Sequence, residues 1–586
     1  MVWGLYTRNG KKLKPWEFSN GKTQNAVIDE ILEAFETSDV VFLRGGVGSG
    51  KSIIAATICG AMDRGIINVP VKTLQEQYQE DYEGRRRIKL GEKTLGIQIL
   101  KGRDNFICER HREKGYRCSR KSLVCTMPLD SETPRWKVAK ECPHWAPIYP
   151  VKIRSLVDSM KGRLMEYPSV TGKQFIYFRE EPCGYYAQNT TYADADVIVY
   201  NNAKWLADTA IGRKPAVDVE VFDEGDLFLD GLNTRTRITV GTITRLDKES
   251  QIVRGELIKN DMRQEADELE ENLKVVKSGF EELLGSTKGD EPQELMGVIE
   301  GYLEFLLEFL SALQTEYTDD LGMRLKNLLR YREDAYFLIE PGKITFFISD
   351  PAIVLHGLRE RSAEKLLFMS ATLQSPKVLE DIYNLGDFTY IEGEPRMQGR
   401  IYPMHTGSER QVNWRNWKKE EFRKRYWETL SKILTRAKRP TLVQIHAYQY
   451  LPENDGHPLL PTQGYLRKMN QEESIAMFKL GKEELLFSTK TDRGIDLPDD
   501  GCRSIVLMKY PFPGIRDPFF MIMRKKLGKE AFWSYYQDLA WREFQQQIGR
   551  GLRNPWDWIE VWSPDLMVHK RITNLETDKV FNQGMD

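Results

Sequence analysis

Apolar residues along this chain collect in short runs that stop at glycine or at acidic residues. Residues 40–44, VVFLR, are apolar and β-branched up to Gly45, and a second apolar stretch, IIAATI, follows at 53–58. Residues 217–222, VDVEVF, alternate apolar and acidic positions before Asp223. Short runs between turn signals are typical of strands, and the first run reads as strand, loop and helix. The pattern therefore predicts an α/β fold.

Two later runs have the same form, and a third pattern is helical. Residues 366–369 precede the triplet SAT at 370–372, and residues 485–487 run into a charged loop. Between residues 241 and 340 the apolar period is that of an amphipathic helix, with acidic residues interspersed. Such a stripe predicts helices that pack on a core. Its apolar positions are Ile299, Tyr302, Leu303, Leu306, Leu310 and Leu313.

Composition narrows the class of protein. The chain has 586 residues, of which 41% are hydrophobic and 29% charged, and this is typical of a folded protein of about three to five domains. The most apolar stretch, GYLEFLLEFLSAL, is broken by Glu304 and Glu308, so no membrane helix is predicted. The opening residues lack a signal-peptide core. A cytoplasmic location, at the nucleoid or in a nucleus, is expected.

Net charge and cysteine content bear on the partners of the chain. The formal net charge is only −1, so nucleic-acid binding cannot be inferred from the global charge. Basic clusters at 84–89 and 110–121 fit either a solvated surface or contacts with phosphates. Seven cysteines in a chain without an export signal predict metal binding or catalysis more than disulfides.

The first apolar run leads into a phosphate-binding loop. Gly45, four further residues, and then Gly50, Lys51 and Ser52 have the spacing of a Walker A motif. Glycine lets backbone N–H groups face a triphosphate, lysine reaches its β- and γ-phosphates, and the serine hydroxyl binds Mg²⁺. The predicted ATP and Mg²⁺ site contains Gly45, Gly48, Ser49, Gly50, Lys51 and Ser52.

Acidic and basic residues later in the chain complete a predicted hydrolytic site. After the strand at 217–222, Asp223 would coordinate Mg²⁺ and Glu224 would orient or deprotonate the attacking water. The segment FQQQIGRGLRN predicts a helix that carries two arginines three positions apart on one face. Arginines on helices are usually surface residues, but this spacing is that of an arginine finger, which stabilises charge on a transferring phosphate. The residues concerned are Gln546, Arg550 and Arg553.

Six motifs together resemble a superfamily 2 helicase. In chain order they are GVGSGKS, VPVKTLQEQY, FDEGD, MSATL, DRGIDLP and QQIGRGLR. The segments LKGRDNFIC, CGYYAQ, ADVIVYNNAKWL and MKYPFPGIRDP resemble, more narrowly, the XPD/DinG branch. The resemblance implies an ATP-dependent DNA helicase that moves 5′ to 3′ on single-stranded DNA, with ATP held between two domains. It adds Gln24, Asp496 and Gln546 to the ATP site.

The same resemblance implies a 4Fe-4S cluster. The family's CPYY element supplies the last cysteine ligand, and Cys183 in CGYY stands in its place, while Cys108 in NFIC matches the first ligand. Cys142, in ECPHW, fits the third ligand, and Cys118 and Cys125 compete for the second, with Cys125 slightly favoured. Thiolates suit iron, but two nearby histidines leave zinc open as an alternative. The histidines are His111 and His144, and the remaining cysteines, Cys59 and Cys502, are expected in the core.

Three departures from the family pattern concern coupling. Asp226, in DEGD, stands where most relatives have a histidine, CGYY lacks the family's proline, and Asn202 replaces another usual histidine. None of these changes removes a predicted Mg²⁺ ligand or the general base. We therefore expect hydrolysis to persist, and the link between hydrolysis and movement to be the function affected.

The positions of the motifs predict two RecA-like domains with two insertions. The helical insertion resembles the Arch domain, and with the cysteine module it would form the passage that separates strands of a duplex bearing a 5′ single-stranded tail. A zinc-containing nucleic-acid-dependent ATPase, an RNA helicase and an ATP-switched scaffold are the alternatives. The pathway, whether repair, replication or mobile-element defence, stays open. The predicted limits are 1–100, 189–240 and 341–395 for the first domain, 101–188 for the cysteine module, 241–340 for the Arch and 396–586 for the second domain.

Overall fold

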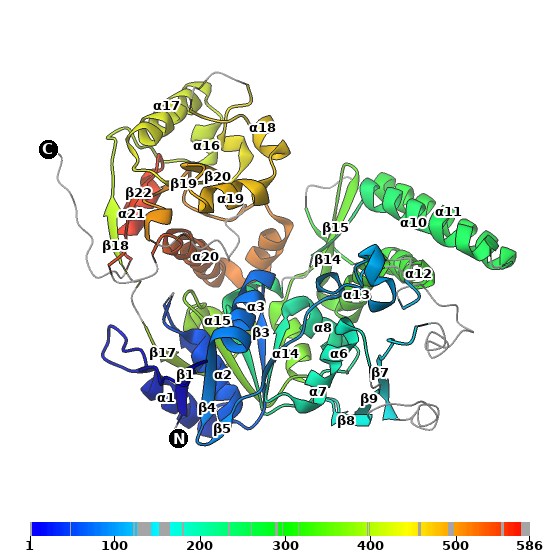
Figure 1. Ribbon diagram of the computed structural model, residues 1–586. Coiled ribbons are helices and arrows are strands. Elements are labelled where there is room, and N and C mark those ends of the chain that lie inside the picture. Colours follow the sequence, from blue (N-terminus) through cyan, green and yellow to red (C-terminus); the bar gives the residue numbers. More distant parts are fainter. Residues whose placement is uncertain are drawn as a thin grey trace.

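The computed structural model describes residues 3–575 of the chain with interruptions (Figure 1). None of the described helices combines the length and the apolar character that a bilayer crossing needs. The residues outside the description are 1–2, 47, 121–122, 126–141, 152–163, 179–180, 233–234, 260, 287–290, 296, 314–315, 395–396, 398, 455–456, 458, 490–496, 498, 553–555 and 576–586.

A seven-stranded sheet forms the centre of the lower domain in Figure 1. All neighbouring strands in it are parallel. Phe42, Phe368 and Phe222 lie side by side on adjacent strands, with ring centroids 5.1 and 4.7 Å apart, and they stack across the middle of the sheet. The strand order is β17 (Thr389–Glu392), β2 (Val40–Arg44), β16 (Lys365–Ser370), β11 (Val219–Asp223), β3 (Gly65–Val69), β10 (Val197–Asn201) and β6 (Ile97–Ile99).

Helices cover both faces of this sheet, because its central strands are apolar on both sides. One face packs on α1 (Gln24–Thr37), α2 (Lys51–Ala61) and α3 (Lys72–Gln79). The other packs on α8 (Asn202–Ala210), α9 (Gly225–Gly231), α14 (Pro351–Arg359) and α15 (Pro376–Tyr383). A π-helix at Glu80–Arg85 follows α3, and a small antiparallel sheet joins β1 (Trp3–Thr7), β4 (Arg86–Leu90) and β5 (Lys93–Thr94).

A second parallel sheet, of five strands, forms the upper domain in Figure 1. The fold class predicted from the sequence, α/β with two RecA-like domains, is confirmed. The strand order is β18 (Arg400–Pro403), β22 (Trp558–Trp562), β21 (Ser504–Leu507), β19 (Thr441–Gln444) and β20 (Leu485–Ser488). Its helices are α16 (Trp414–Trp417), α17 (Glu420–Arg436), α18 (Gln463–Lys468), α19 (Gln471–Lys479), α20 (Pro518–Gly549) and α21 (Leu566–Ile572).

Helix α20 connects the two domains. It begins at Pro518, where the side chain of Asp517 caps the helix by accepting from the N–H of Phe519, and Gly528 interrupts its helical backbone. The first part of α20 contributes Phe519 and Tyr535 to the apolar core of the first domain, and its end packs in the second. The end of α20 is therefore held at the boundary between the two sheets.

The first insertion contains the cysteines and little regular structure. Its antiparallel sheet has the order β7 (Ile148–Pro150), β9 (Gln174–Phe178) and β8 (Leu164–Pro168), and the short helix α6 (Gly184–Ala187) follows Cys183. The chain then passes through the short helix α7 (Thr191–Asp194) and enters the main sheet at β10.

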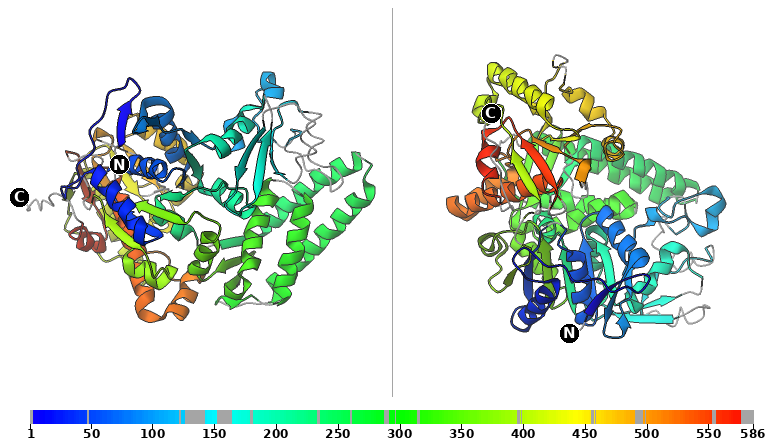
Figure 2. Two further views of the ribbon diagram at one scale, coloured as in Figure 1. Left: turned by 90° about the horizontal axis from the view of Figure 1, so that it is seen from below. Right: turned by 60° about the vertical axis from the view of Figure 1, so that its left-hand side comes forward.

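The second insertion is a helical arm that extends to the right in Figure 1 and along the lower right in the left view of Figure 2. In α12, five of the six residues of the predicted apolar stripe are buried, and Tyr302 is half-buried. The arm's helices are α10 (Val240–Lys259), α11 (Arg263–Ser286), α12 (Gly297–Leu313) and α13 (Glu316–Arg330).

One part of the predicted domain assignment differs in the structure. Residues 235–239 and 343–348 were assigned to the first RecA-like domain, but they pair in an antiparallel sheet at the base of the arm. Most of their apolar residues are buried, and helices α10 and α13 of the arm lie against them, so these strands belong with the insertion. The sheet has the order β12 (Arg235–Thr239), β15 (Lys343–Ile348), β14 (Ala335–Glu340) and β13 (Gln293–Glu294).

Candidate nucleotide site and cysteine module

The Walker A loop joins β2 to α2 at the carboxyl edge of the first sheet. Gly48 and Gly50 have φ angles of 78° and 74°, a region that glycine adopts without the clash of a Cβ. Helix α2 begins at Lys51, so its first N–H groups open toward the loop. The Lys51 Nζ donates to the carbonyl oxygens of Gly45 at 3.0 Å and Gly46 at 3.2 Å, which places its charge over the loop.

Gln24 supports this loop through two hydrogen bonds. Its Oε1 accepts from the backbone N–H of Trp16 at 2.9 Å, and its Nε2 donates to the carbonyl oxygen of Ser49 at 3.2 Å. A Cβ on Gly50 would meet the Gln24 Nε2 at 2.2 Å. The sequence resemblance put Gln24 at the nucleotide, and the structure places it against the backbone of the phosphate loop.

The two acidic residues lie at the end of β11. Asp223 is the last residue of the strand, and Glu224 follows with a φ of 56°, a left-handed conformation that costs a residue with a side chain about 1 kcal/mol or more. Such strain is found at functional sites, where the surroundings hold it in place. Burial and the neighbouring Glu224 raise the pKa of Asp223 to about 6. The Ser370 hydroxyl donates to Glu224 at 3.3 Å and so orients its carboxylate.

Two tyrosines that follow the first domain's third strand complete this site. The Tyr78 hydroxyl donates to Asp223 Oδ2 at 2.8 Å, and the Tyr82 hydroxyl donates to Ser52 Oγ at 3.4 Å. Both rings are buried, and their hydroxyls reach the two groups that are expected to hold Mg²⁺. Tyr78 lies within the quoted motif VPVKTLQEQY, but no pattern in the sequence showed that it would face Asp223.

A cavity of about 600 Å³ separates these groups from the end of α20. It is open between the two RecA-like domains, and its wall includes four cations. The predicted site residues that line it are Gly48, Gly50, Lys51, Ser52, Asp223, Glu224, Gln546 and Arg550, and Arg85 and Arg86 are the cations that were not predicted. Gly45, Ser49 and Gln24 lie behind the loop.

The predicted arginine helix ends earlier than the sequence suggested. Helix α20 stops at Gly549, and Arg550 is its C-terminal cap, so Arg550 enters the cavity from a helix end and not from a helix face. The second arginine, Arg553, and the predicted nucleotide residue Asp496 both lie outside the described residues.

A buried charge cluster joins α20 to α9 beside the cavity. Arg542, on α20, donates to both carboxylate oxygens of Asp230 at 2.7 and 3.0 Å and to Asp538 at 2.7 Å. Its guanidinium also lies 3.7 Å from Asp226, the residue that replaces the usual histidine. Asp226 is fully buried and accepts from the Thr372 hydroxyl at 2.9 Å.

The same threonine contacts the second domain directly. Gln546, one helical turn beyond Arg542, donates to Thr372 Oγ1 at 2.6 Å. Thr372 therefore receives Gln546 and donates to Asp226, which makes a continuous chain from the acidic motif to α20. No sequence motif predicted Arg542, although its spacing of four from Gln546 places both on one side of the helix.

Backbone hydrogen bonds bring the cysteines of the first insertion together. Cys108 donates its N–H to Tyr116 at 2.8 Å, and Cys118 donates its N–H to Phe106 at 2.8 Å, so these two cysteines lie on paired segments. Cys183 donates its N–H to the carbonyl oxygen of His144 at 3.2 Å, two residues after Cys142.

The thiols are mutual electrostatic neighbours. Burial, with Cys183, Cys108 and Cys125 close by, raises the pKa of Cys118 to about 12. Burial also raises the pKa of Cys142, with Cys125 and Cys108 adding to the effect, and that of Cys183, with Cys125 and Cys142 adding to it. Cys125 packs against both the small apolar cluster of Cys108 and Cys118 and the core that contains Cys142 and Cys183, so the five cysteines lie in one region.

The donor set of the module is rich in thiols. Thiolates hold iron–sulfur clusters through four cysteines, and they also bind zinc. The five cysteines therefore offer the kind of ligand that either metal group takes.

Arg103 connects this cluster to the aromatic residues after Cys183. Its guanidinium donates to Cys125 Sγ at 3.6 Å and to the Tyr186 hydroxyl at 3.0 Å, and it stacks on Tyr185 at 4.3 Å. Within the described part of the module, this hydrogen bond from Arg103 reaches the sulfur of Cys125 and not that of Cys118.

Comparison with known proteins agrees with this architecture. Residues 432–581 match the family model described as Helicase C-terminal domain. A solved structure of an XPD helicase matches 95% of this chain and 99% of its own length, at 16% identity and a TM-score of 0.59. The chain has the fold of an XPD helicase. The resemblance predicted from the motifs is therefore confirmed at the level of the fold.

Further XPD structures agree. XPD without ligand matches at a TM-score of 0.56 and 15% identity over 94% of this chain and 100% of that one. S. tokodaii Xpd4 matches at 0.55 and 15% over 95% and 99%. No curated protein matches the sequence. The family model lies in the second RecA-like domain, and the solved structures match the fold over most of the chain.

Proposed function

We propose that the protein is an ATP-dependent DNA helicase that moves 5′ to 3′ along single-stranded DNA and unwinds duplexes with a 5′ single-stranded tail. The observation that carries the proposal is the cavity between the two RecA-like domains. Lys51, Asp223 and Glu224 line it from the first domain, and Gln546 and Arg550 line it from the second. A site built from two domains can change the angle between them when its ligand changes, which is what a motor needs.

Five side chains of the cavity have a role in hydrolysis in this proposal. Lys51 and the α2 N–H groups hold the phosphates, and Ser52 and Asp223 supply oxygens for Mg²⁺, which neutralises phosphate charge when it is bound. Glu224, held by Ser370, takes the proton of the attacking water. Arg550 stabilises the charge that develops on the transferring phosphate. Arg553 and Asp496 remain predicted partners in these roles.

The charge cluster at Arg542 couples hydrolysis to movement in this proposal. Asp226 lies two residues after Glu224 and is bonded to Thr372, while Arg542 and Gln546 belong to the second domain. A shift of the segment that carries Glu224 and Asp226 would therefore displace α20, because hydrogen bonds through Thr372 join the two. The aspartate in place of histidine is compensated by a cation, because Arg542 supplies the positive charge that a buried carboxylate needs.

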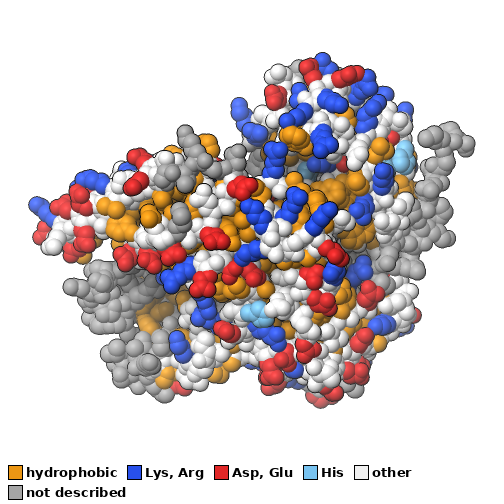
Figure 3. All heavy atoms as spheres, turned by 180° about the vertical axis from the view of Figure 1, so that it is seen from behind, with side chains coloured by type: hydrophobic (Ala, Val, Ile, Leu, Met, Phe, Trp, Pro, Cys, Tyr) orange, Lys and Arg blue, Asp and Glu red, His pale blue; other side chains and the backbone are white. Residues whose placement is uncertain are grey.

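Single-stranded DNA needs cations along its backbone and aromatic faces for its bases. Lys and Arg side chains are frequent on the upper domain in the rear view of Figure 3. Trp414, on α16, is 56% exposed, and it has Lys418 at 3.6 Å and Arg516 at 4.8 Å from its ring centre. This exposed ring between two cations is our candidate for a base-stacking position.

The cysteine module would carry a 4Fe-4S cluster. Cys108, Cys125, Cys142 and Cys183 would hold it, with Cys118 as the competitor of Cys125. When bound, the cluster supplies iron–thiolate bonds that cross-link the segments that carry the cysteines. With the helical arm, the module would form the passage in which the strands separate.

One set of assays tests this function. ATPase activity is measured with and without single-stranded DNA and RNA, and unwinding is measured on duplexes with a 5′ or a 3′ tail. We expect DNA to stimulate hydrolysis and the 5′ tail alone to support unwinding. Stimulation by RNA only would favour the RNA helicase, and bound zinc without iron or colour would favour the zinc-containing ATPase. Turnover that ignores both nucleic acids would contradict a motor function.

A further inference from the structure

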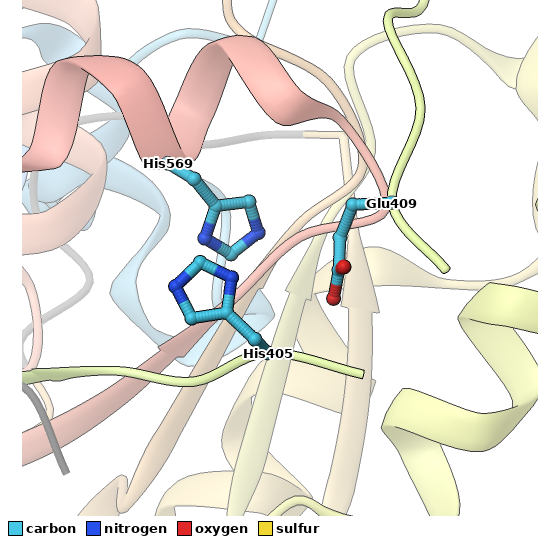
Figure 4. Close-up of side chains that lie close together, drawn as sticks. All are labelled: His405, Glu409 and His569. Carbon is cyan, nitrogen blue, oxygen red and sulfur yellow. The ribbon is translucent and has the colours of Figure 1, made fainter. Parts of the chain in front are cut away.

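Two histidines and a glutamate meet at the edge of the second sheet, far from the nucleotide cavity. His405 follows β18, Glu409 lies in the same loop, and His569 is in α21. Figure 4 shows the two imidazole rings one above the other, with the Glu409 carboxylate beside them. One ligand atom from each residue lies within 4.8 Å of the other two, and the ring centroids are 4.1 Å apart.

We propose that His405, Glu409 and His569 form a structural Zn²⁺ site that ties α21 to the first strand of the second domain. Three atoms no more than 4.8 Å apart all lie within 4.8/√3, or about 2.8 Å, of one common point. Zinc bonds to nitrogen and carboxylate oxygen are about 2.0–2.2 Å long. Side-chain rotations that move each ligand atom by less than about 1 Å would therefore bring all three atoms to bonding distance. Two imidazoles and one carboxylate are a borderline donor set that suits zinc.

The backbone that carries these ligands is held in place. Strands β18 and β22 are parallel neighbours, and both ligand segments leave their carboxyl ends. Beyond the strands, the N–H of Arg410 donates to the carbonyl oxygen of Pro564 at 3.0 Å, and the N–H of Leu566 donates back to Arg410 at 3.1 Å. The Asp565 carboxylate accepts from Val412 at 3.2 Å. A metal site requires this kind of support, because loosely held ligands lose binding energy to ordering.

Hydrogen bonds orient two of the three ligand side chains. Glu409 Oε1 accepts from the backbone N–H of Thr406 and from its hydroxyl, the latter at 2.9 Å, so both bonds fall on one carboxylate oxygen and Oε2 stays available. His569 Nε2 lies 2.9 Å from the carbonyl oxygen of Ser563. Ligands of metal sites characteristically have such partners outside the metal's own coordination sphere.

His569 also has a polar atom that the described protein leaves unused. The side chain is 9% exposed, and its Nδ1 has no hydrogen-bond partner among the described residues. A buried polar atom without a partner is destabilising, so it calls for an explanation. Only Nε2 of the imidazole has a hydrogen-bond partner there, so Nδ1 is available to bind a metal ion.

The site would act on the fold and not on the chemistry of ATP. None of its three residues lines the nucleotide cavity. Strand β18 is four residues long, lies at the edge of its sheet and is the first strand after the chain leaves the first domain. A zinc ion there would hold the point at which the chain enters the second domain. Because His405 is exposed, water can reach the ion and take the fourth coordination position.

Zinc content and a cobalt spectrum test the site in the full-length protein. The variants are His405→Ala and Glu409→Gln, and His356→Ala is the matched control because it also removes an exposed histidine, from α14 of the first domain. After equilibration with Zn²⁺, we expect wild type and the control to retain about one equivalent more zinc than His405→Ala. Co²⁺ bound at this site in place of Zn²⁺ should give weak visible bands without the strong near-ultraviolet bands of thiolate ligands. His405→Ala and Glu409→Gln should both lose these weak visible bands.

Two further readouts separate this site from the cysteine module. Zn²⁺ should raise the Tm of wild type by about 2–4 °C and leave that of His405→Ala unchanged. It should also slow hydrogen exchange at residues 400–412 in wild type only. Equal zinc content, equal cobalt spectra or equal exchange in wild type and His405→Ala would each overturn the proposal, whatever the result for helicase activity. The histidine pair would then be an ordinary stacking contact.

Discussion

The nucleotide cavity and the cysteine module are stabilised in different ways. The cavity is built from residues at the ends of buried parallel strands, and its acidic and hydroxyl groups are already hydrogen-bonded to one another. The module has a three-stranded sheet and a four-residue helix, and its five cysteines are gathered from segments far apart in the sequence. We therefore expect the first region to keep its shape without a metal, whereas the proposed cluster would hold the second together. Each region should therefore fail separately.

The largest effect should come from damage to the cavity alone. Lys51→Ala and Glu224→Gln should both abolish steady-state hydrolysis. The first variant lacks the cation that binds the phosphates, and the second lacks the general base, which contributes about 10²–10⁴-fold to the rate. Nucleotide binding should differ between them: Glu224→Gln should still retain ATP, and Lys51→Ala should not. Equilibrium binding of labelled ATP measures this difference.

Glu92→Gln is the control for that pair, since Glu92 is an exposed carboxylate in the turn between β4 and β5. It should behave as wild type in both assays. An equal loss of ATP affinity in Lys51→Ala and Glu224→Gln would contradict the separate roles of the two side chains.

Damage to the module alone should separate hydrolysis from unwinding. Wild type purified without oxygen should be brown and contain iron, and Cys183→Ser should lose its colour, keep most of its DNA-stimulated ATPase activity and fail to unwind a 5′-tailed duplex. Removing one of four ligands releases the cross-link that the metal supplies, while helix α2 with Lys51 and strand β11 with Asp223 remain intact. Iron analysis, visible absorbance and paired ATPase and unwinding assays measure the result.

The matched control is Cys502→Ser, which also removes a buried thiol, but in the second domain. It should stay brown. The same substitution at Cys118 and Cys125 then identifies the second ligand, because only the ligand's loss should bleach the protein. If Cys183→Ser unwinds as well as wild type, Cys183 is a packing residue.

A smaller effect is expected where the two domains meet. Arg542→Lys keeps the positive charge but loses the planar fork that binds Asp230 through two hydrogen bonds. We expect DNA stimulation of the ATPase to fall about tenfold, with little change in ATP affinity, because the substitution weakens the coupling and not the site. Arg524→Lys, on the exposed side of the same helix, should have no effect. Equal stimulation in the two variants would remove Arg542 from the coupling path.

The smallest effect concerns pH. Because the pKa of Asp223 is raised to about 6, a proton competes with Mg²⁺ for this carboxylate below that pH. The Mg²⁺ affinity measured with ATP present should be constant above pH 7 and should fall up to about tenfold per unit below pH 6. Tyr78→Phe removes a hydrogen bond to the carboxylate, so it should move the midpoint to higher pH. A flat profile from pH 7 to 5 would contradict the role of Asp223.

Sequence patterns predicted the parts of the cavity that depend on local structure. The glycine spacing of the Walker A loop and the acidic pair after a strand both arise within a few residues, so the chain encodes them directly. The contact of Arg542 with Asp230 joins residues 312 positions apart, and it depends on how α20 lies against α9. No periodicity reports that kind of contact.

Two other features escaped prediction for related reasons. Strands β12 and β15 have the apolar content of any buried strand, and only the pairing of β12 with β15 and of β15 with β14 shows that they belong to the arm. His405 and His569 are far apart in the sequence and become neighbours because β18 pairs with β22. For the cysteines, the resemblance to a family supplied the expected ligands, and the spacing alone left the choice between Cys118 and Cys125 open.

Unwinding of a 5′-tailed DNA duplex in the presence of ATP and Mg²⁺ tests the helicase proposal most directly. The same duplex with a 3′ tail and the Glu224→Gln variant are run in parallel as controls. The proposal predicts strand separation by wild type on the 5′-tailed substrate only, and none by Glu224→Gln on either. Absence of unwinding by iron-loaded wild type on both tails, or equal unwinding by Glu224→Gln, would contradict it.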